Sequence, residues 1–562
     1  IWSRTPGQDS QTQLWTPAAL FAAACLMFLI SCWGNRQRAP ITPLPDWPNG
    51  APATEAAPVP PGLAGKETAA APNFRQLDSA LQKLGFDDSY FADQEPIRSM
   101  PSLPEDVSLQ TSAPLAAIEH PGLAPEDGLD EPPVSGTERK AQGQTTAGAV
   151  PYRVLDPNAQ FVLIAMFGGD NNLSPQVKND LGEMAAGAAR YGAVAALALA
   201  DTDTGPGTIL EVTPTGQLRT IEQLSEIDTG DPETLAQFLS RALITYPMAR
   251  KAIGFWDHGT GVFDETDPGE VLLDRNVMTR RSVRTPARRL LIPRAQRDAL
   301  RRDPGTRAML HDNSGGVLTN IEAGRMLRAA FSRSGQQQRT DLIYSDTCLN
   351  GMIEVLEELS DFAHCIVASC DTEPPAGWDY EEWIRRTAST IPADPAGWAR
   401  HAVQAFGASY QNQTQHYPCT LSAYYSGNDI TEAFAALVAV CDTEGFQAFS
   451  LLNLARSRSQ GYANRDTYDL GHFAAILARV CAGRAPTIEA AATQLIQACQ
   501  KARIDWVALG PTVTASQGLA FWFPSSRRSL EQDIATYRRL KFNRLTNWGD
   551  YLTKMYQEDG VG

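Results

Sequence analysis

From residue 151 onward, uninterrupted apolar runs alternate with segments of helical periodicity, and this alternation most constrains the fold. A strand that is apolar at every position is typical of a parallel sheet covered on both faces. Asp231 and Pro232 mark a helix start, with Asp as cap and Pro in the first turn, and this helix extends to about Tyr246. A further helix is expected over residues 175–189. The apolar runs lie at residues 160–167, 194–200, 251–256 and 341–345. The pattern predicts an α/β fold with a doubly wound, mostly parallel sheet flanked by helices.

The preceding segment, residues 33–150, has a different composition. It holds 17 of the 38 prolines among Ala-, Glu- and Ser-rich stretches. Such a segment cannot bury enough apolar surface to fold, so we expect a disordered Pro/Ala-rich tether. Within it, residues 73–91 carry apolar side chains at helical spacing, which predicts either a transient helix or a short docking helix.

An uncharged apolar run at residues 15–33 precedes the tether and is flanked by Arg4 and Arg36. Its end, Leu29-Ile30-Ser31-Cys32, is similar to a bacterial lipobox, in which the cysteine is acylated. Residues 1–32 are therefore predicted to be a lipoprotein-type signal with Cys32 as the lipidation site. The alternative is one uncleaved transmembrane helix, because roughly 19 apolar residues just cross the hydrocarbon core. Either interpretation predicts a membrane-anchored protein of the bacterial cell envelope whose folded part lies outside the cytoplasm.

Charge and cysteine content exclude some classes of function. With 48 basic and 64 acidic residues the net charge is -16, which disfavours a nucleic acid as partner. The nine cysteines are too few for a disulfide scaffold, and none has the CxxC spacing of a zinc site. The sequence thus requires no metal and no cofactor.

Reactive side chains follow two of the predicted strands. Ligands of open α/β sheets bind beyond the carboxyl ends of the strands. His258 follows the run at 251–256 and Cys348 follows the run at 341–345, so we expect the two to be neighbours although they are 90 positions apart. Either residue alone has a structural interpretation, Cys348 as a small buried side chain and His258 as a solvated turn residue.

Together the two residues predict nucleophilic catalysis. A thiol attacks carbonyl carbon as the thiolate, and an imidazole can exchange the proton with the leaving amine. We expect a helix over residues 349–359, whose positive end would favour the Cys348 thiolate. The glycine beside His258 indicates close approach of the backbone to a substrate, so the amides of Gly259 and Cys348 are candidate oxyanion donors. Strand alternation points Asp257 away from His258, so Asp257 is not predicted as a third member.

Eight segments, in order, resemble the clostripain-like cysteine peptidases, a family of the caspase-like clan. They cover roughly residues 155–530 and are FGGDNNLSP, ADTDT, GDPETLAQFL, FWDHGTGV, YSDTCLNGMIEVLEEL, VASCDTEPPAGWDY, YDLGHFA and GLAFWFP. The resemblance implies a Cys-His dyad at Cys348 and His258 and a thioacyl-enzyme. It also implies a caspase-like catalytic core over residues 151–400 and a C-terminal α/β region of the peptidase unit over residues 401–562. Some members of the family depend on calcium, which makes calcium possible here by resemblance only.

The resemblance also implies cleavage after arginine or lysine. In this family the residue two before the nucleophile gives the specificity pocket its negative charge, and here that residue is Asp346. Its i, i+2 relation to Cys348 puts both side chains on one side of the strand end. A carboxylate binds guanidinium through two parallel hydrogen bonds, so arginine should be the better substrate. Asp346 has a structural alternative as a cap of the following helix. Asp371 or Glu373 would add a second charge, while Ala376 stands where relatives are often more polar.

Eleven arginines lie between Arg275 and Arg307, inside a predicted Arg-rich loop at residues 265–310. Because some relatives mature by cutting themselves after the histidine strand, this loop is a predicted self-processing site. A solvated basic loop, or a surface paired with the acidic body, is the alternative. The main hypothesis is a cysteine endopeptidase acting on proteins or peptides with basic cleavage sites. The alternatives are a catalytically silent surface lipoprotein of the same fold that binds a protein, and a cysteine-dependent acyl transferase.

Overall fold

The structure is a computed structural model, and it describes only part of the chain. The predicted anchor at 1–32 with Cys32, the tether up to residue 148, and most of the Arg-rich loop at 265–310 lie outside the described residues. Among the residues that are described, no helix is both long and apolar enough to cross a membrane. The described residues are 149–262, 276–278, 284–286, 308–312, 316–336, 339–374, 376–390, 394–411, 418–464 and 466–558.

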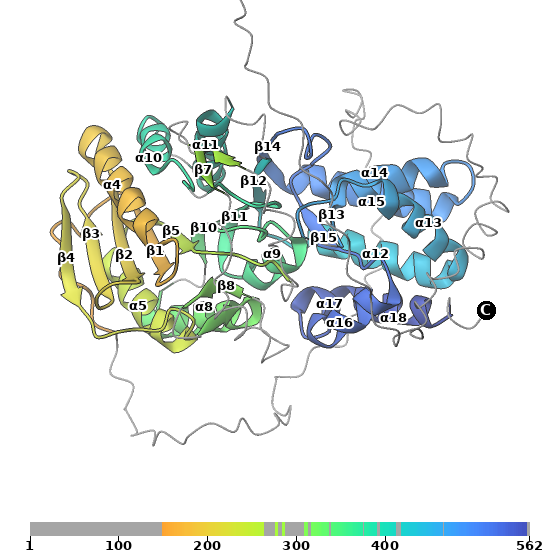
Figure 1. Cartoon of the computed structure of the whole chain (residues 1–562), viewed down its shortest axis with the longest axis horizontal. Helices are drawn as coiled ribbons and strands as arrows, with labels where there is room; N and C mark the ends of the chain where they lie inside the picture. Colours follow the sequence, from red (N-terminus) through yellow and green to blue (C-terminus); the bar gives the residue numbers. More distant parts are fainter. Residues whose placement is uncertain are drawn as a thin grey trace, which may run out of the picture. The chain divides into compact units, whose positions relative to one another are not determined.

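Nine strands form one mixed sheet in the order β14-β12-β11-β10-β5-β1-β2-β3-β4 (Figure 1). The five central strands pair in parallel; they are β1 (Phe161–Gly169), β2 (Val194–Thr202), β5 (Arg250–Trp256), β10 (Thr340–Asp346) and β11 (Ala363–Ala368). The outer strands pair antiparallel; they are β3 (Thr208–Val212), β4 (Leu218–Gln223), β12 (Cys419–Tyr425) and β14 (Arg503–Leu509). The four predicted strands and the α/β class are confirmed, and the antiparallel pairing is confined to the two margins of the sheet.

Helices cover both faces of this sheet, which explains why its central strands are apolar throughout (Figure 1). Side chains of β1 alternate between two cores, with Ile164 on one face and Leu163 on the other. The core that contains Ile164 is closed by α5 (Pro232–Thr245), α8 (Asn320–Ser334) and α9 (Ile353–Leu359). The core that contains Leu163 is closed by α4 (Ser174–Tyr191), α10 (Tyr380–Ala388) and α11 (Pro395–Tyr410). Asp231 caps α5 as predicted, since its side chain accepts from the amides of Glu233 and Thr234.

Two short strand pairs precede α8. Strands β8 (Ala308–His311) and β9 (Val317–Thr319) pair antiparallel, and Thr319 then opens α8 with a capping box to Glu322. Strands β6 (Asn276–Met278) and β7 (Arg284–Pro286) also pair antiparallel and lie within the predicted Arg-rich loop.

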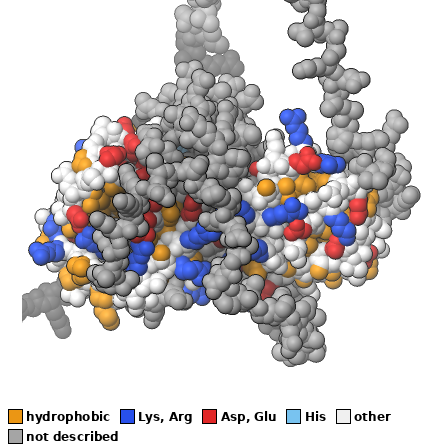
Figure 2. All heavy atoms as spheres, turned by 90° about the horizontal axis from the view of Figure 1, so that it is seen from below, with side chains coloured by type: hydrophobic (Ala, Val, Ile, Leu, Met, Phe, Trp, Pro, Cys, Tyr) orange, Lys and Arg blue, Asp and Glu red, His pale blue; other side chains and the backbone are white. Residues whose placement is uncertain are grey.

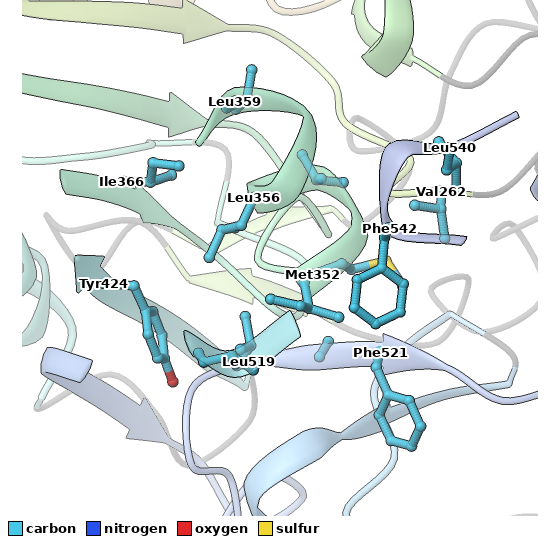
Figure 3. Packing of buried hydrophobic residues seen from close by; sticks show 14 of the residues in the cluster. Val262, Met352, Leu356, Leu359, Ile366, Tyr424, Leu519, Phe521, Leu540 and Phe542 are labelled. Atoms are coloured by element: carbon cyan, nitrogen blue, oxygen red, sulfur yellow. The ribbon is translucent and has the colours of Figure 1, made fainter. Parts of the chain in front are cut away.

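The C-terminal region contributes to the same sheet and packs against the loop that follows Cys348. It supplies β12 and β14, and its short strand β15 pairs with β13 and bridges to Met352. Met352, Leu356, Leu519, Phe521 and Phe542 pack together in the core (Figure 3). The remaining elements are α12 (Asp429–Glu444), α13 (Phe446–Arg458), β13 (Thr467–Asp469), α14 (Leu470–Cys481), α15 (Pro486–Ala502), β15 (Ala520–Trp522), α16 (Arg527–Tyr537), α17 (Lys541–Thr546) and α18 (Trp548–Glu558).

The prediction of a helix over residues 349–359 is wrong at the amino-terminal end of the helix. Helix α9 begins at Ile353, and Leu349 has a left-handed backbone with φ of 65°. The amides of Leu349 and Gly351 donate to the carbonyls of Asp371 and Ser369, at 3.1 and 2.6 Å. Because these tertiary bonds hold the loop in a non-helical path, the positive end of a helix does not lie directly beside Cys348.

Charged side chains of both signs share the surface. On the described part of the face in Figure 2, Lys and Arg side chains are interspersed with Asp and Glu side chains. On the described part of that face the acidic side chains therefore do not gather into one patch.

Candidate active site

Cys348 and His258 line one small pocket at the carboxyl ends of β5 and β10. These strands are parallel neighbours with Trp256 opposite Asp346, so the chain leaves the sheet at both ends side by side. The Asp257 amide donates to the Asp346 carbonyl at 3.4 Å, which continues the pairing by one residue. The pocket is lined by Leu173, Trp256, Asp257, His258, Asp346, Thr347, Cys348, Glu373, Pro374 and Gly377.

Cys348 differs in its surroundings from the other cysteines of the described residues. It is partly exposed, whereas the others are buried; they are Cys365, Cys370, Cys419, Cys441, Cys481 and Cys499. Burial raises the pKa of each of these six thiols, to about 12 at Cys365 and Cys499. The Cys348 Sγ accepts the backbone N–H of Glu373 at 3.2 Å. A hydrogen bond donated to sulfur favours the thiolate over the thiol. The Glu373 amide therefore takes the role that the sequence analysis gave to the positive end of a helix.

His258 is held from two sides. Its Nε2 lies 3.0 Å from the side-chain oxygen of Asn172, and its backbone N–H donates to the Asp257 carboxylate at 2.5 Å. The same carboxylate oxygen accepts the side-chain amide of Asn171 at 2.8 Å. Sequence reasoning did not assign a role to either asparagine. Their position just past the end of a strand, in FGGDNNLSP, was the available signal.

The two loops touch at Gly259. A Cβ atom built there would lie 2.1 Å from the Cys348 carbonyl oxygen, so only glycine permits this approach. Asn350 ties the loops together, because its Oδ1 accepts the Gly261 amide at 3.2 Å while its Nδ2 donates to the Thr347 hydroxyl at 2.5 Å. The predicted oxyanion donors, the amides of Gly259 and Cys348, thus belong to two backbones in contact beside the thiol.

The other end of the pocket is acidic. Asp346 and Glu373 both line it and are 6% and 4% exposed. Tyr380 donates its hydroxyl to Asp346 at 2.9 Å, and the Trp378 indole N–H donates to Glu373 at 3.0 Å. Burial, followed by the adjacent Asp346 carboxylate, raises the pKa of Glu373 well above its usual range. Two carboxyl groups that share a buried site retain a proton more readily than either would alone.

Asp180 is a third buried carboxylate near this pair, whereas Asp371 is not among the residues that line the pocket. Asp180 is 1% exposed and accepts the Trp256 indole N–H at 2.8 Å. Asp371 instead accepts the Thr372 amide at 2.7 Å, so of the two residues proposed to add a second charge it is Glu373 that lines the pocket. Asp346 does not cap α9, whose first residues lack a side-chain cap.

A larger groove lies at the opposite end of the central strands, beside the starts of β10 and β11. This groove of about 990 Å³ is bordered by Arg328, Arg339, Asp361 and Glu432, and none of the described residues that line it is a cysteine or histidine. It therefore lacks the nucleophile and base of the first pocket. Within the described ranges, no group of three or more His, Cys, Asp or Glu side chains is arranged to hold a metal ion.

Sequence and structure comparisons relate this chain to known proteins. A sequence model described as the Clostripain family, peptidase C11, matches residues 166–273 and 298–553. A secreted C11 cysteine protease from Bacteroides thetaiotaomicron, solved with an irreversible peptide inhibitor, has a TM-score of 0.50 at 14% identity; the match covers 69% of this chain and 99% of that one. An inactive zymogen C11 protease from Parabacteroides distasonis has a TM-score of 0.50 at 16% identity, covering 70% and 99%. These likenesses show a common fold. A comparison with curated protein sequences finds no match.

Proposed function

The chain belongs to the Clostripain family of cysteine proteases, and from this membership we propose an endopeptidase that cleaves after arginine or lysine, with Cys348 as nucleophile and His258 as its proton-transfer partner. The observation that carries the proposal is that Cys348, His258, Asp346 and Glu373 line one pocket. A nucleophile, a base and a pair of carboxylates within one pocket are what hydrolysis beside a basic residue needs.

Catalysis proceeds in two steps. The Cys348 thiolate attacks the scissile carbonyl carbon, and the backbone amides of Gly259 and Cys348 stabilise the oxyanion. As the C–N bond breaks, imidazolium His258 gives its proton to the departing amine and a thioester remains. Neutral His258 then takes a proton from water, hydroxide adds to the thioester, and the thiolate leaves as the carboxylic acid forms.

The substrate side chain enters the acidic end of the pocket. The support is that Asp346 and Glu373 line the same pocket as Cys348, so a basic side chain bound there would bring its charge to them. A guanidinium group can use both carboxylates through parallel hydrogen bonds, whereas an ammonium group interacts as a point charge, so arginine is the expected preference. The indole and phenol groups around these carboxylates keep water out and strengthen the ion pair.

Hydrolysis of an arginyl peptide amide tests the proposed nucleophile. The Cys348→Ala variant should lose activity while keeping its far-ultraviolet circular dichroism and melting temperature. Cys365→Ala is the matched control, because it removes a buried thiol outside the pocket by the same substitution and should retain activity. A Cys348→Ala protein with wild-type turnover would refute the assignment.

We also propose that the enzyme processes itself within residues 265–310. The support is the run of eleven arginines between Arg275 and Arg307, next to the His258 loop in sequence. Incubation of the wild type, followed by intact-mass and amino-terminal analysis, should give fragments ending in arginine from this segment. The Cys348→Ala protein should stay intact under the same conditions, and cleavage there would point to another protease.

For location, we propose attachment to the cell envelope through Cys32, with the protease outside the cytoplasm. The support is the lipobox-like Leu29-Ile30-Ser31-Cys32 sequence and the apolar run before it. Metabolic labelling with a fatty acid should mark the wild type and not Cys32→Ser. Label on the variant would contradict lipidation at this residue.

A further inference from the structure

The turn between β1 and α4 forms one wall of the pocket and lies against the His258 loop. Strand β1 is the parallel neighbour of β5, with Phe167 opposite Trp256, so the residues after both strands emerge side by side. Leu173, the last residue of the turn, lines the pocket together with His258. Residues far apart in sequence, 170–173 and 257–259, are thereby placed at the same edge of the sheet.

Asn171 fixes the shape of this turn. Its side-chain amide donates to the Gly168 carbonyl and to the Asp257 carboxylate, each at 2.8 Å, and its side-chain oxygen accepts the Leu173 amide at 2.8 Å. The side chain is buried at 2% exposure. Since Leu173 is also buried, both neighbours of Asn172 are anchored, and the backbone at residue 172 has little freedom.

Asn172 directs its side chain to the catalytic ring. Its Oδ1 lies 3.0 Å from the His258 Nε2. An amide oxygen can only accept, so this bond requires the hydrogen of neutral imidazole to be on Nε2 and leaves the lone pair on Nδ1. The bond also restricts rotation of a ring whose own backbone is already held by Asp257.

We propose that Asn172 is a positioning residue that orients His258 through Nε2, so that Nδ1 is the nitrogen that exchanges the proton with Cys348 and the leaving amine. This inference rests on the proposed function of the Cys348 and His258 pair. The contact that carries this proposal is the one between the Asn172 Oδ1 and the ring, so the proposed role is to hold the ring. A neutral amide orients the ring without adding a charge that would stabilise imidazolium.

Two variants separate positioning from a merely structural contact. Asn172→Ala should lower kcat about 10-fold to 100-fold with KM within twofold, since proton transfer contributes on the order of 10²–10⁴ and only its alignment is lost. Asn172→Asp keeps an acceptor at the same place but adds a negative charge. It should retain more activity than Asn172→Ala and shift the alkaline limb of kcat/KM upward by about one pH unit, because the new charge stabilises imidazolium.

The remaining groups that share this environment are unchanged in both variants. They are Cys348 and Asp346 from the end of β10, Asp257 beside the ring, Glu373 after β11, and Asp170 in the turn of Asn172. A shift between wild type and Asn172→Asp therefore reports the added charge alone. Asn179→Ala is the matched control, because Asn179 is exposed on α4 and its side chain donates to Gln176 on the same helix.

The experiment compares the full-length variants by steady-state kinetics from pH 5 to 10, with melting temperatures, and by the rate of Cys348 alkylation with iodoacetamide. Alkylation reports the thiolate and imidazolium pair without peptide hydrolysis. We expect the inflection of its pH profile that marks loss of the imidazolium proton to move upward in Asn172→Asp and to stay unchanged in Asn179→Ala. Wild-type kcat in Asn172→Ala, or an unshifted profile in Asn172→Asp, would overturn the positioning role. Activity surviving in Cys348→Ala would instead overturn the proposed function, so the two failures are distinguishable.

Discussion

The paired carboxylates of the pocket yield a quantitative prediction for substrate charge. Burial and the neighbouring Asp346 raise the pKa of Glu373 well above its usual range, so the pair holds a proton to a higher pH than an isolated carboxyl group would. A cationic side chain favours ionisation of both groups and releases that proton. In Asp346→Asn or Glu373→Gln, the remaining carboxylate loses its repulsive partner and ionises, so it partly replaces the missing charge.

The magnitude follows from the interaction of one carboxylate with one bound cation. At about 4 Å and an effective dielectric constant of about 20, this interaction contributes about 4 kcal/mol, equivalent to about 1000-fold in kcat/KM. Each single variant should therefore lose only about 10-fold on an arginyl substrate, because the other carboxylate compensates. The Asp346→Asn/Glu373→Gln double variant should lose about 1000-fold, more than the product of the two single effects.

Paired peptide amides with arginine or the uncharged isostere citrulline isolate the charge effect. The ratio of the arginyl kcat/KM to the citrulline kcat/KM should fall about 10-fold in each single variant and about 1000-fold in the double variant. In the wild type, the KM of the arginyl substrate should decrease as pH rises through titration of the pair, while the KM of the citrulline substrate should not change. Asp550→Asn, which removes an exposed carboxylate paired with Arg538 on the surface, is the control and should leave the ratio unchanged. A ratio unaffected in the double variant would place the specificity pocket elsewhere, and strictly additive effects would show that the carboxylates do not share a proton.

Three further predictions concern the glycine contact, a second buried carboxyl group and metal dependence. Gly259→Ala should abolish activity because its Cβ would lie 2.1 Å from the Cys348 carbonyl oxygen; Gly182→Ala, with no atom within 4 Å of the new Cβ, should keep full activity in the same assay. Burial, and then Asp312, raise the pKa of Asp201 to about 8, so the folded state holds a proton that the unfolded state releases, and stability should fall between about pH 4 and pH 8. Asp201→Asn should narrow the difference in melting temperature between pH 5 and pH 8, and an unchanged difference would contradict this. Because thiolate and imidazole chemistry uses no metal, EDTA should leave kcat/KM unchanged; a loss restored by calcium would make calcium a cofactor.

The sequence predicted the parts of the fold that depend on short-range pattern. Apolar runs marked the central strands, since both faces of β1 are buried. Asp231 before Pro232 marked the start of α5 for a local reason, a side-chain cap on two free amides. The placement of Cys348 and His258 in one pocket followed from both residues lying just past parallel strands.

Short-range sequence patterns could not predict the features that depend on tertiary contacts. The order of strands puts β1 beside β5, and this adjacency brings Asn171 to Asp257 and Asn172 to His258. Strands β3 and β4 have no long apolar run, because they form a margin of the sheet and are less fully buried than β1. The choice between Asp371 and Glu373 depends on the path of a loop that sequence spacing does not specify.

The late start of α9 shows how such contacts determine the chemistry. The sequence from Leu349 to Leu359 is compatible with one continuous helix, yet the amides of Leu349 and Gly351 bond to the loop after β11, and the Gly351 carbonyl accepts the Ala520 amide at 2.9 Å. The loop that these bonds hold in place also brings the Glu373 amide to 3.2 Å from the Cys348 sulfur and its carboxylate into the acidic end of the pocket. One residue thus contributes its backbone to the nucleophile and its side chain to the substrate charge. Because Glu373→Gln keeps the amide and changes only the side chain, its effect on substrate preference is separable from thiolate reactivity.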